Sequence, residues 1–473
     1  MIVSRLLRFA VLVVIVFMAV PAAAVKAEPR MPVGFFDDPS FRWSTVAATN
    51  LRAASGVHTS IVHALADWSQ IAPEKPANPL NGDDPAYNLS DLDTLVRTAP
   101  KYGLQVLITI TGTPKWANGG QTTNHPPTHL ADLTTFAHML AARYNGHRSG
   151  FGAVTRWSVW NEPNLQLFLT PQFNASGKIV SPQEYVKLWL AAYTGIKAGN
   201  PSALVAAGET SNRGHNHPTG GGSDSVAPAT FANLVAKAAP KLPMAAWAEH
   251  PYPALPHPSA TQKATYPEVR LTNIDKFGAS LQQWFHRRVP IWVTEWAEQT
   301  APEYHQGGIS GISYAQQARD VKTALQLAQA SPYVEMFIWF VFRDSDSKTW
   351  FSGIEKKTGV KKPAFNVFAA AAKNVDGQSI VVAPNHTFKA KIYVPLLSYY
   401  DTPGSPVGVT WAVFQGKGVA AEAQPRVTLS ADQTVNFTVN FKPAKGVTYT
   451  MTVNVNDKHG WKVKRTVTLI PSS

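Results

Sequence analysis

The sequence predicts an α/β chain, a (β/α)8 TIM barrel followed by a small all-β sandwich. Short apolar segments alternate with helical segments eight times between residues 31 and 372. The apolar segments lack a polar face, which is typical of parallel strands covered on both sides. After residue 376 short alternating segments separated by turn residues replace this pattern. We therefore place the barrel at residues 28–376 and the sandwich at 377–473.

The barrel strands are expected where β-branched and aromatic residues gather between turns. They are residues 31–36, 57–65, 104–110, 154–160, 203–207, 244–249, 290–294 and 334–340. The alternative is a doubly wound open sheet. That fold would usually show a glycine-rich phosphate turn after the first strand, and none is present here.

Helices are expected between these strands. They are residues 43–54, 90–102, 130–144, 181–198, 230–238, 271–286, 314–330 and 364–372. Two of them carry clear start signals. Ser90 precedes Asp91 and Asp93, which the helix dipole favours in a first turn. Ser181 precedes a proline and, three residues later, Glu184, which together resemble a capping box.

The tail shows six short segments without a helical pattern. They are residues 388–395, 407–414, 424–429, 433–441, 447–455 and 461–470. Turn pairs such as Pro403-Gly404, Lys445-Gly446 and Asn456-Asp457 separate them. Roughly a hundred residues is the size of one sandwich.

Composition excludes several protein classes. Of the 473 residues, 45% are hydrophobic and only 15% are charged, which excludes a disordered or coiled-coil chain. Cysteine is absent, which excludes a disulfide scaffold, a thiolate zinc site and a cysteine nucleophile. The net charge of +13 is thinly spread, and no nucleic-acid-binding motif accompanies it. We therefore expect no nucleic-acid partner.

The first 27 residues predict a secretory signal peptide. Arg5 and Arg8 precede an apolar run over residues 6–20, and small residues follow up to Ala27. An uncleaved membrane anchor is the alternative, but this run is short for a spanning helix. No later segment has 18 uninterrupted apolar residues. We expect a secreted, extracellular protein without membrane contact after signal removal.

Two glutamates stand at the ends of predicted barrel strands. Glu162 follows the fourth strand, and Glu295 ends the seventh. Active sites of such barrels lie at the carboxyl ends of the strands. Two carboxyl groups facing each other across a barrel mouth can cleave a glycosidic bond. A structural role for each glutamate, as the partner of an arginine or as a helix cap, is the alternative.

The sequence around these glutamates resembles the clan A glycoside hydrolases. Residues 157–164, WSVWNEPN, are similar to their fourth-strand motif, and residues 291–296, IWVTEW, to their nucleophile segment. Residues 249–252, EHPY, resemble their sixth-strand His-x-Tyr motif, and residues 353–354 and 362–365 their barrel-closing segment. The resemblance covers about residues 31–373. It is nearest to families 5 and 39, which are the cellulase-like and xylosidase-like members. It also suggests a secreted actinobacterial protein.

The resemblance implies roles for individual residues. Glu162 would be the general acid/base and Glu295 the nucleophile of a retaining mechanism. Asn161 would bind the sugar 2-hydroxyl. Tyr252 would donate a hydrogen bond to the nucleophile and keep it ionised, and His250 would line the same wall.

Aromatic side chains near other strand ends are candidate sugar platforms. Trp339 would stack on the sugar, and Trp68 and Trp116 are further subsite candidates, with barrel or loop packing as the alternative. In the loop after the eighth strand, Asp344 and Trp350 are candidates on the same footing as Trp68 and Trp116.

Other polar residues receive separate expectations. Glu209, at the end of the fifth strand, is expected to bond a sugar hydroxyl, and Glu298 to lie on a loop surface. Many cellulase-like members carry an arginine near the nucleophile. It is missing here, and His63 is placed where it could substitute. His215 and His217 lack a third metal ligand, so we expect no metal there; their glycine-rich loop, residues 212–225, could form a lid.

The function that we predict is retaining hydrolysis of O-glycosidic bonds in a poly- or oligosaccharide. Carbohydrate would be the partner, the protein would be a monomer, and no cofactor or metal would be required. A transglycosidase using the same site and a non-catalytic carbohydrate-binding barrel are the alternatives.

Overall fold

The structure is a computed structural model. It describes residues 31–306, 308–345, 350–376, 378–393, 404–430, 434–447, 449–456 and 462–471. The predicted signal peptide, residues 1–27, lies outside the described residues. Within them, no helix combines the length and the apolar character needed to cross a membrane.

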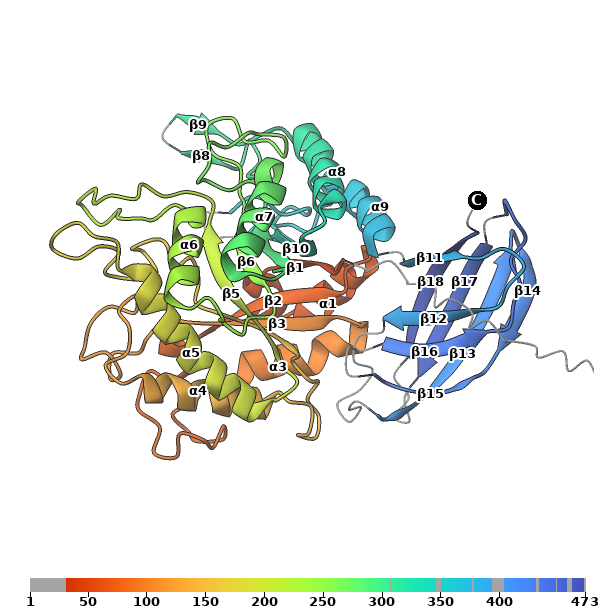
Figure 1. The fold of residues 1–473 in the computed structure, drawn as a ribbon, viewed down its shortest axis with the longest axis horizontal. Helices are drawn as coiled ribbons and strands as arrows, with labels where there is room; N and C mark the ends of the chain where they lie inside the picture. The colour runs from red at the N-terminus through yellow and green to blue at the C-terminus, as the bar shows by residue number, and fades with distance from the viewer. Residues whose placement is uncertain are drawn as a thin grey trace, which may run out of the picture.

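A closed barrel of parallel strands forms the larger part of the molecule (Figure 1). Its strands follow one another around the barrel in the order β1, β10, β7, β6, β5, β4, β3, β2. Their bounds are β1 Val33–Phe36, β2 Ile61–Asp67, β3 Gln105–Thr111, β4 Arg156–Val159, β5 Leu204–Ser211, β6 Trp247–His250, β7 Ile291–Trp296 and β10 Val334–Phe340. The short hairpin of β8 (His305–Gln306) and β9 (Ile309–Ser310) lies between β7 and β10. The predicted TIM barrel is confirmed.

Helices surround the barrel. They are α1 Ala47–Gly56, α2 Trp68–Ile71, α3 Ser90–Thr98, α4 Leu130–Arg143, α5 Ser181–Gly199, α6 Pro228–Ala238, α7 Ile274–Phe285, α8 Tyr314–Ala330 and α9 Ala364–Asp376, with short η1 Pro39–Trp43, η2 Ala99–Tyr102 and η3 Leu271–Asn273. Ser90 and Ser181 are the first helical residues rather than side-chain caps. The helix expected from residue 43 begins at Ala47, because η1 occupies residues 39–43.

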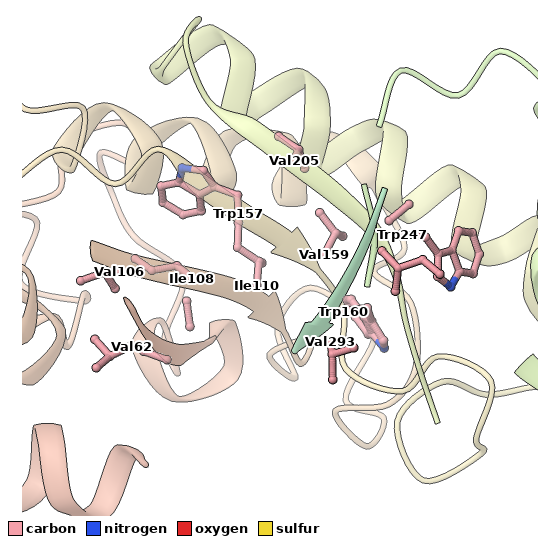
Figure 2. Packing of buried hydrophobic residues seen from close by; sticks show 14 of the residues in the cluster. Val62, Val106, Ile108, Ile110, Trp157, Val159, Trp160, Val205, Trp247 and Val293 are labelled. Atoms are coloured by element: carbon pink, nitrogen blue, oxygen red, sulfur yellow. The ribbon is translucent and has the colours of Figure 1, made fainter. Parts of the chain in front are cut away.

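Two apolar layers hold the barrel. Outward-facing strand residues pack against the helices, and Figure 2 shows some of them, among them Val62, Ile108, Val205 and Val293. A smaller cluster has the opposite strand parity and fills the interior, with Phe36, Ile61, Leu107, Ala206, Ala246, Ala248, Trp292, Met336 and Ile338 as its members. This alternation decides which side chains can reach the barrel mouth.

The C-terminal residues form two small sheets (Figure 1). One contains β11 Gln378–Val382, β13 Pro406–Gln415, β14 Gly418–Ala423, β15 Arg426–Thr428, β17 Tyr449–Asn456 and β18 Lys462–Pro471, and the other β12 Phe388–Tyr393 and β16 Thr434–Val439. Trp411 and Met451 of the first sheet share one buried cluster with Ile392 and Phe437 of the second. Strands β11 and β14 were not predicted from the sequence.

The sheets of the tail lie beside the end of the barrel where the strands begin. Ala153, just before β4, packs against the tail cluster. Helix α9 leads into the tail, which lies to one side of the barrel in Figure 1. The barrel mouth, where the strands end, is therefore at the opposite end.

Candidate active site at the carboxyl ends of the barrel strands

Two β-bulges turn glutamates into the barrel mouth. Between the pairs Val293↔Phe337 and Trp296↔Trp339, the consecutive residues Thr294 and Glu295 stand opposite a single residue of β10. A bulge of this kind lets neighbouring side chains share one face. Glu295 is thereby placed at the mouth beside Thr294, whose hydroxyl reaches the other inward-facing glutamate.

The second bulge involves Glu209. Gly208 pairs with Ala248 and Thr210 with Glu249, so Glu209 is an extra residue in β5. Its φ of 51° lies in the left-handed region, which is uncommon for a residue with a side chain. Such strained positions persist where surrounding contacts hold them.

His250, the last residue of β6, joins three carboxylates. Its Nε2 lies 2.7 Å from Glu209 Oε2, while its Nδ1 lies 3.2 Å from Glu162 Oε1 and 3.7 Å from Glu295 Oε2. The imidazole is fully buried. Rather than merely lining a wall, as the sequence suggested, it occupies the centre of the site.

This arrangement stabilises a charged histidine. Burial by itself would lower the pKa of His250, but Glu295, Glu162 and Glu209 together raise it well above its ordinary value. Burial would also raise the pKa of Glu209, yet the hydrogen bond and charge of His250 leave that pKa lowered. His250 and Glu209 therefore form a buried ion pair next to Glu162 and Glu295.

Glu295 has a raised pKa. Burial is the main cause and brings the pKa to about 7, and the charge of Glu162 acts in the same direction. The His250 charge and a hydrogen bond from Tyr252 act against it. Tyr252 Oη donates to Glu295 Oε2 at 2.9 Å. The expected hydrogen bond is thus present, but it does not outweigh burial.

The separation of Glu162 and Glu295 is bounded by His250. One oxygen of each lies 3.2 or 3.7 Å from the same Nδ1 atom, so these oxygens cannot be further apart than the sum of both distances. That sum lies near the lower end of the spacing of about 6.5–9.5 Å found in inverting glycosidases. It is compatible with the spacing of about 5–5.5 Å found in retaining ones.

Neutral polar groups form the floor below the carboxylates. His63 Nε2 lies 2.6 Å from Thr109 Oγ1, and its Nδ1 lies 3.2 Å from the Thr294 carbonyl. Burial lowers the pKa of His63 to about 4, so it is neutral near pH 7. His63 occupies the barrel interior without supplying the positive charge of an arginine; His250 supplies that charge instead.

Asn161 adjoins Glu162 and is almost completely buried. Its side-chain oxygen has no hydrogen-bond partner in the part of the chain that the structure describes. An unpaired buried amide oxygen is uncommon in folded proteins and often marks a ligand position.

Two of the expected sugar platforms are wrong. Trp339 is 0% exposed, packs between Trp296 and Phe368, and donates its indole N–H to the Ser352 carbonyl at 2.9 Å. It faces the helices, because its neighbours in β10 face the interior. Trp68 is buried against Phe136 under the loop after β2.

Trp350 packs beside Tyr252, whose hydroxyl contacts Glu295, and Phe340 packs on Trp350. The Trp350 ring centre lies 5.9 Å from that of Tyr252 and 4.8 Å from that of Phe340. Trp350 was a candidate from the sequence, and Phe340 was missed. The only signal for Phe340 in the sequence was its position at the end of the eighth strand, next to Trp339. Trp116 is partly buried, and its indole N–H donates to the Ala72 carbonyl at 2.8 Å.

Other predicted residues lie outside the carboxylate cluster. Glu298, expected on a loop surface, is only 2% exposed, because its loop folds against α8 near Asp320. Asp344 forms a buried ion pair with Lys362 at 2.8 Å. The ring centres of His215 and His217 lie 5.9 Å apart, and the described residues include no group of three or more side chains suited to a metal ion.

Comparison with known proteins supports the barrel architecture. No protein-family model and no curated protein match the sequence. A family 39 glycoside hydrolase from Bacteroides cellulosilyticus WH2 has a TM-score of 0.51 at 16% identity, over 87% of this chain and 79% of that one. The GH5_18 protein of Streptomyces cattleya, solved with GlcNAc, has a TM-score of 0.51 at 14% identity, over 73% of this chain and 81% of that one. At this identity the similarity concerns the fold. The chain has the fold of the clan A glycoside hydrolases.

Proposed function

We propose that the protein is a retaining glycoside hydrolase that cleaves O-glycosidic bonds in a poly- or oligosaccharide. The observation that carries the proposal is the placement of Glu162 and Glu295 on the same nitrogen of His250. Two carboxyl groups at this spacing, at the mouth of a barrel, suit a double displacement.

In the first step the ionised Glu295 attacks the anomeric carbon, and the bond to the leaving oxygen breaks. Glu162 donates its proton to that oxygen. In the second step Glu162 takes a proton from water, whose oxygen attacks the anomeric carbon. The glycosyl bond to Glu295 then breaks and restores the carboxylate.

The surrounding residues assist both steps. The positive His250 lies within reach of both carboxylates and stabilises negative charge as it moves between them. The Tyr252 hydroxyl orients Glu295. Asn161 is placed to accept a hydrogen bond from a sugar hydroxyl next to Glu162. Trp350 and Phe340 provide an aromatic wall for a pyranose ring.

The test separates the two glutamates. Wild-type protein is incubated with a panel of polysaccharides and aryl glycosides, and reducing ends and product masses are measured. Glu295→Gln should abolish turnover of every responsive substrate. Glu162→Ala should spare substrates with acidic phenol leaving groups, and azide should restore its turnover with a glycosyl azide of retained configuration. Glu184→Gln on exposed α5 is the control and should behave as wild type.

Three outcomes would change the proposal. Azide rescue of Glu295→Ala with an inverted product would exchange the two roles. Transfer of the glycosyl group to added sugars in preference to water would identify a transglycosidase. Sugar binding without turnover of any substrate would identify a non-catalytic binding protein.

A further inference from the structure

A cavity lies on the rim of the barrel mouth, away from the carboxylate cluster. Its volume is about 510 Å³, within the size range of small-molecule sites. It is lined by Asp38, Arg42, Trp43, Leu65, Asp67, Gln70, Ile71, Asn88, Ser90 and Asp91. These residues come from the loop after β1, the end of β2, α2 and the start of α3.

Trp43 provides an exposed but fixed aromatic surface in this cavity. Its side chain is 63% exposed, the highest value for an aromatic residue in the described part of the chain. Its indole N–H donates to Asp91 Oδ2 at 2.9 Å, and the Arg42 guanidinium lies 5.7 Å from the ring centre. The hydrogen bond to Asp91 and the contact with Arg42 therefore fix the ring, while most of it stays exposed to solvent. A rigid open indole is suited to stacking on the apolar face of a sugar ring.

Asp38 and Arg42 line the cavity but are nearly buried. The side chains of Asp38 and Arg42 are each only 6% exposed. Asp38 Oδ1 and Arg42 Nε nevertheless have no hydrogen-bond partner among the described residues. Both atoms are themselves buried, so a ligand in the cavity would meet the half-buried carboxyl groups of Asp67 and Asp91 instead.

The charge of the cavity restricts the ligand. Asp38, Asp67 and Asp91 supply three carboxylates, and Arg42 is the only cation among the lining residues. Arg42 already forms ion pairs with Asp38 at 2.9 Å and Asp91 at 2.8 Å. A negatively charged sugar would meet net repulsion here, whereas a neutral sugar can donate its hydroxyls to the carboxylates.

The cavity shares a face of the barrel with the candidate active site. Leu65 and Asp67 belong to the carboxyl end of β2. Leu65 packs on the barrel interior cluster that includes Phe36, and the ring centres of Phe36 and Phe340 lie 5.0 Å apart. Phe340 contacts Trp350, which contacts Tyr252 beside Glu295. A chain of packed apolar side chains thus runs from the cavity to the carboxylates.

We propose that this cavity is a second sugar-binding site, which takes a neutral pyranose unit of the glycan whose scissile bond lies at Glu162 and Glu295. Trp43 stacks on the ring, and the carboxylates of Asp67 and Asp91 accept hydrogen bonds from its hydroxyls. The connection to catalysis rests on the function proposed above; the binding site itself does not. A substrate of several sugar units is implied, because a single unit cannot occupy both places.

Direct binding tests the site without turnover. Glu295→Gln protein is titrated calorimetrically with neutral gluco- and manno-oligosaccharides of two to six units, and with oligogalacturonate as the anionic probe. Adding Trp43→Ala should weaken binding of the longer neutral oligomers tenfold or more and leave disaccharide binding unchanged. Trp43→Phe, which keeps an aromatic face, should stay within threefold. Leu190→Ala, another exposed apolar residue on α5, is the control and should have no effect.

The outcomes separate this proposal from the proposed function. Equal binding by Trp43→Ala and the Glu295→Gln parent for every neutral oligomer overturns the second site, even if the wild type hydrolyses glycans. Trp43-dependent binding of oligogalacturonate overturns the neutral sugar class. Trp43-dependent binding of neutral oligomers by a protein that hydrolyses none of them supports the site and overturns the enzyme.

Discussion

Glu209 Oε2 lies 2.7 Å from His250 Nε2, on the side of the imidazole opposite to Glu162 and Glu295. The same oxygen accepts a hydrogen bond from Thr294 Oγ1 at 2.6 Å. Glu209 thus fixes both the ring that contacts the two carboxylates and the residue that precedes Glu295. It is fully buried, so it positions these groups without touching a substrate.

On the proposed function, replacing Glu209 by glutamine should move the pH profile of hydrolysis. His250 loses one of the three carboxylates that raise its pKa, so its imidazolium form is less favoured and stabilises the Glu295 carboxylate less. The pKa of Glu295 should rise, and the acidic limb of kcat/KM should move to higher pH. We expect kcat to fall ten- to a hundredfold with KM little changed, measured with an aryl glycoside between pH 5 and 9.

Glu249→Gln provides a matched control for that variant. Glu249 is fully buried in β6, next to His250, and bonds Thr210 on the opposite face of the strand. Burial raises its pKa well above the ordinary value, which favours the uncharged carboxyl, and glutamine is uncharged as well. Its pH profile should match the wild type. If the acidic limb of kcat/KM of Glu209→Gln moved to lower pH instead, His250 would keep its proton without Glu209.

The raised pKa of Glu295 predicts the pH dependence of the wild type. A nucleophile must be ionised, and the pKa of Glu295 is about 7. Activity should therefore fall about tenfold for each pH unit below 7. The Tyr252 hydrogen bond lowers this pKa, so Tyr252→Phe should move the acidic limb upward. Tyr87→Phe is the control, since the Tyr87 hydroxyl donates to the Pro79 carbonyl. An acidic limb near pH 4 in the wild type would contradict this assignment.

Local patterns in the sequence were enough to predict the barrel and to bring Glu162 and Glu295 to one place. Strand and helix periods differ, and residues at the carboxyl ends of parallel strands meet at one face. Glu209 was recognised only as a residue at a strand end. Its inward position depends on a bulge between β5 and β6. Regular alternation of inward and outward side chains along a strand does not predict where such an extra residue is inserted.

The aromatic residues of β10 show a second limit of sequence analysis. The strand reads VEMFIWF, in which aromatic and aliphatic residues stand on both faces. Hydrophobicity therefore could not indicate whether Trp339 or Phe340 faces the mouth. Register with β1 and β7 decides this, and register is a tertiary property. The burial of Glu298 likewise depends on how a loop packs on α8.

The two tryptophans of this region should respond differently to substitution. Trp350→Ala removes a ring next to Tyr252 and Phe340, so KM for an aryl glycoside should rise several-fold while the melting temperature changes little. Trp339→Ala empties a fully buried position behind the barrel wall and should lower the free energy of unfolding by about 3–5 kcal/mol. Kinetics and denaturant unfolding of both variants measure the contrast. Trp339→Phe keeps most of the packing. If it raised KM more than Trp350→Ala does, Trp339 would be a sugar contact after all.

Two buried glutamates near the β7–α8 loop should have opposite effects on stability. Burial raises the pKa of Glu298 from 4.5 to about 10, and the charge of Asp320 and a hydrogen bond with its carboxylate act in the same direction. Because the unfolded chain releases this proton near pH 4.5 and the folded chain does not, the contribution of Glu298 to the free energy of unfolding falls as pH rises between these values. Glu298→Gln should therefore raise the free energy of unfolding by up to about 3 kcal/mol at pH 7 and by less than about 1 kcal/mol at pH 5.

Glu355→Gln should instead lower the free energy of unfolding by about 1–3 kcal/mol, because Glu355 accepts two hydrogen bonds from Arg343, at 3.0 and 2.7 Å. Urea unfolding of both variants at the two pH values gives the comparison. A destabilised Glu298→Gln at pH 7 would show that this carboxyl is ionised and paired in the folded protein.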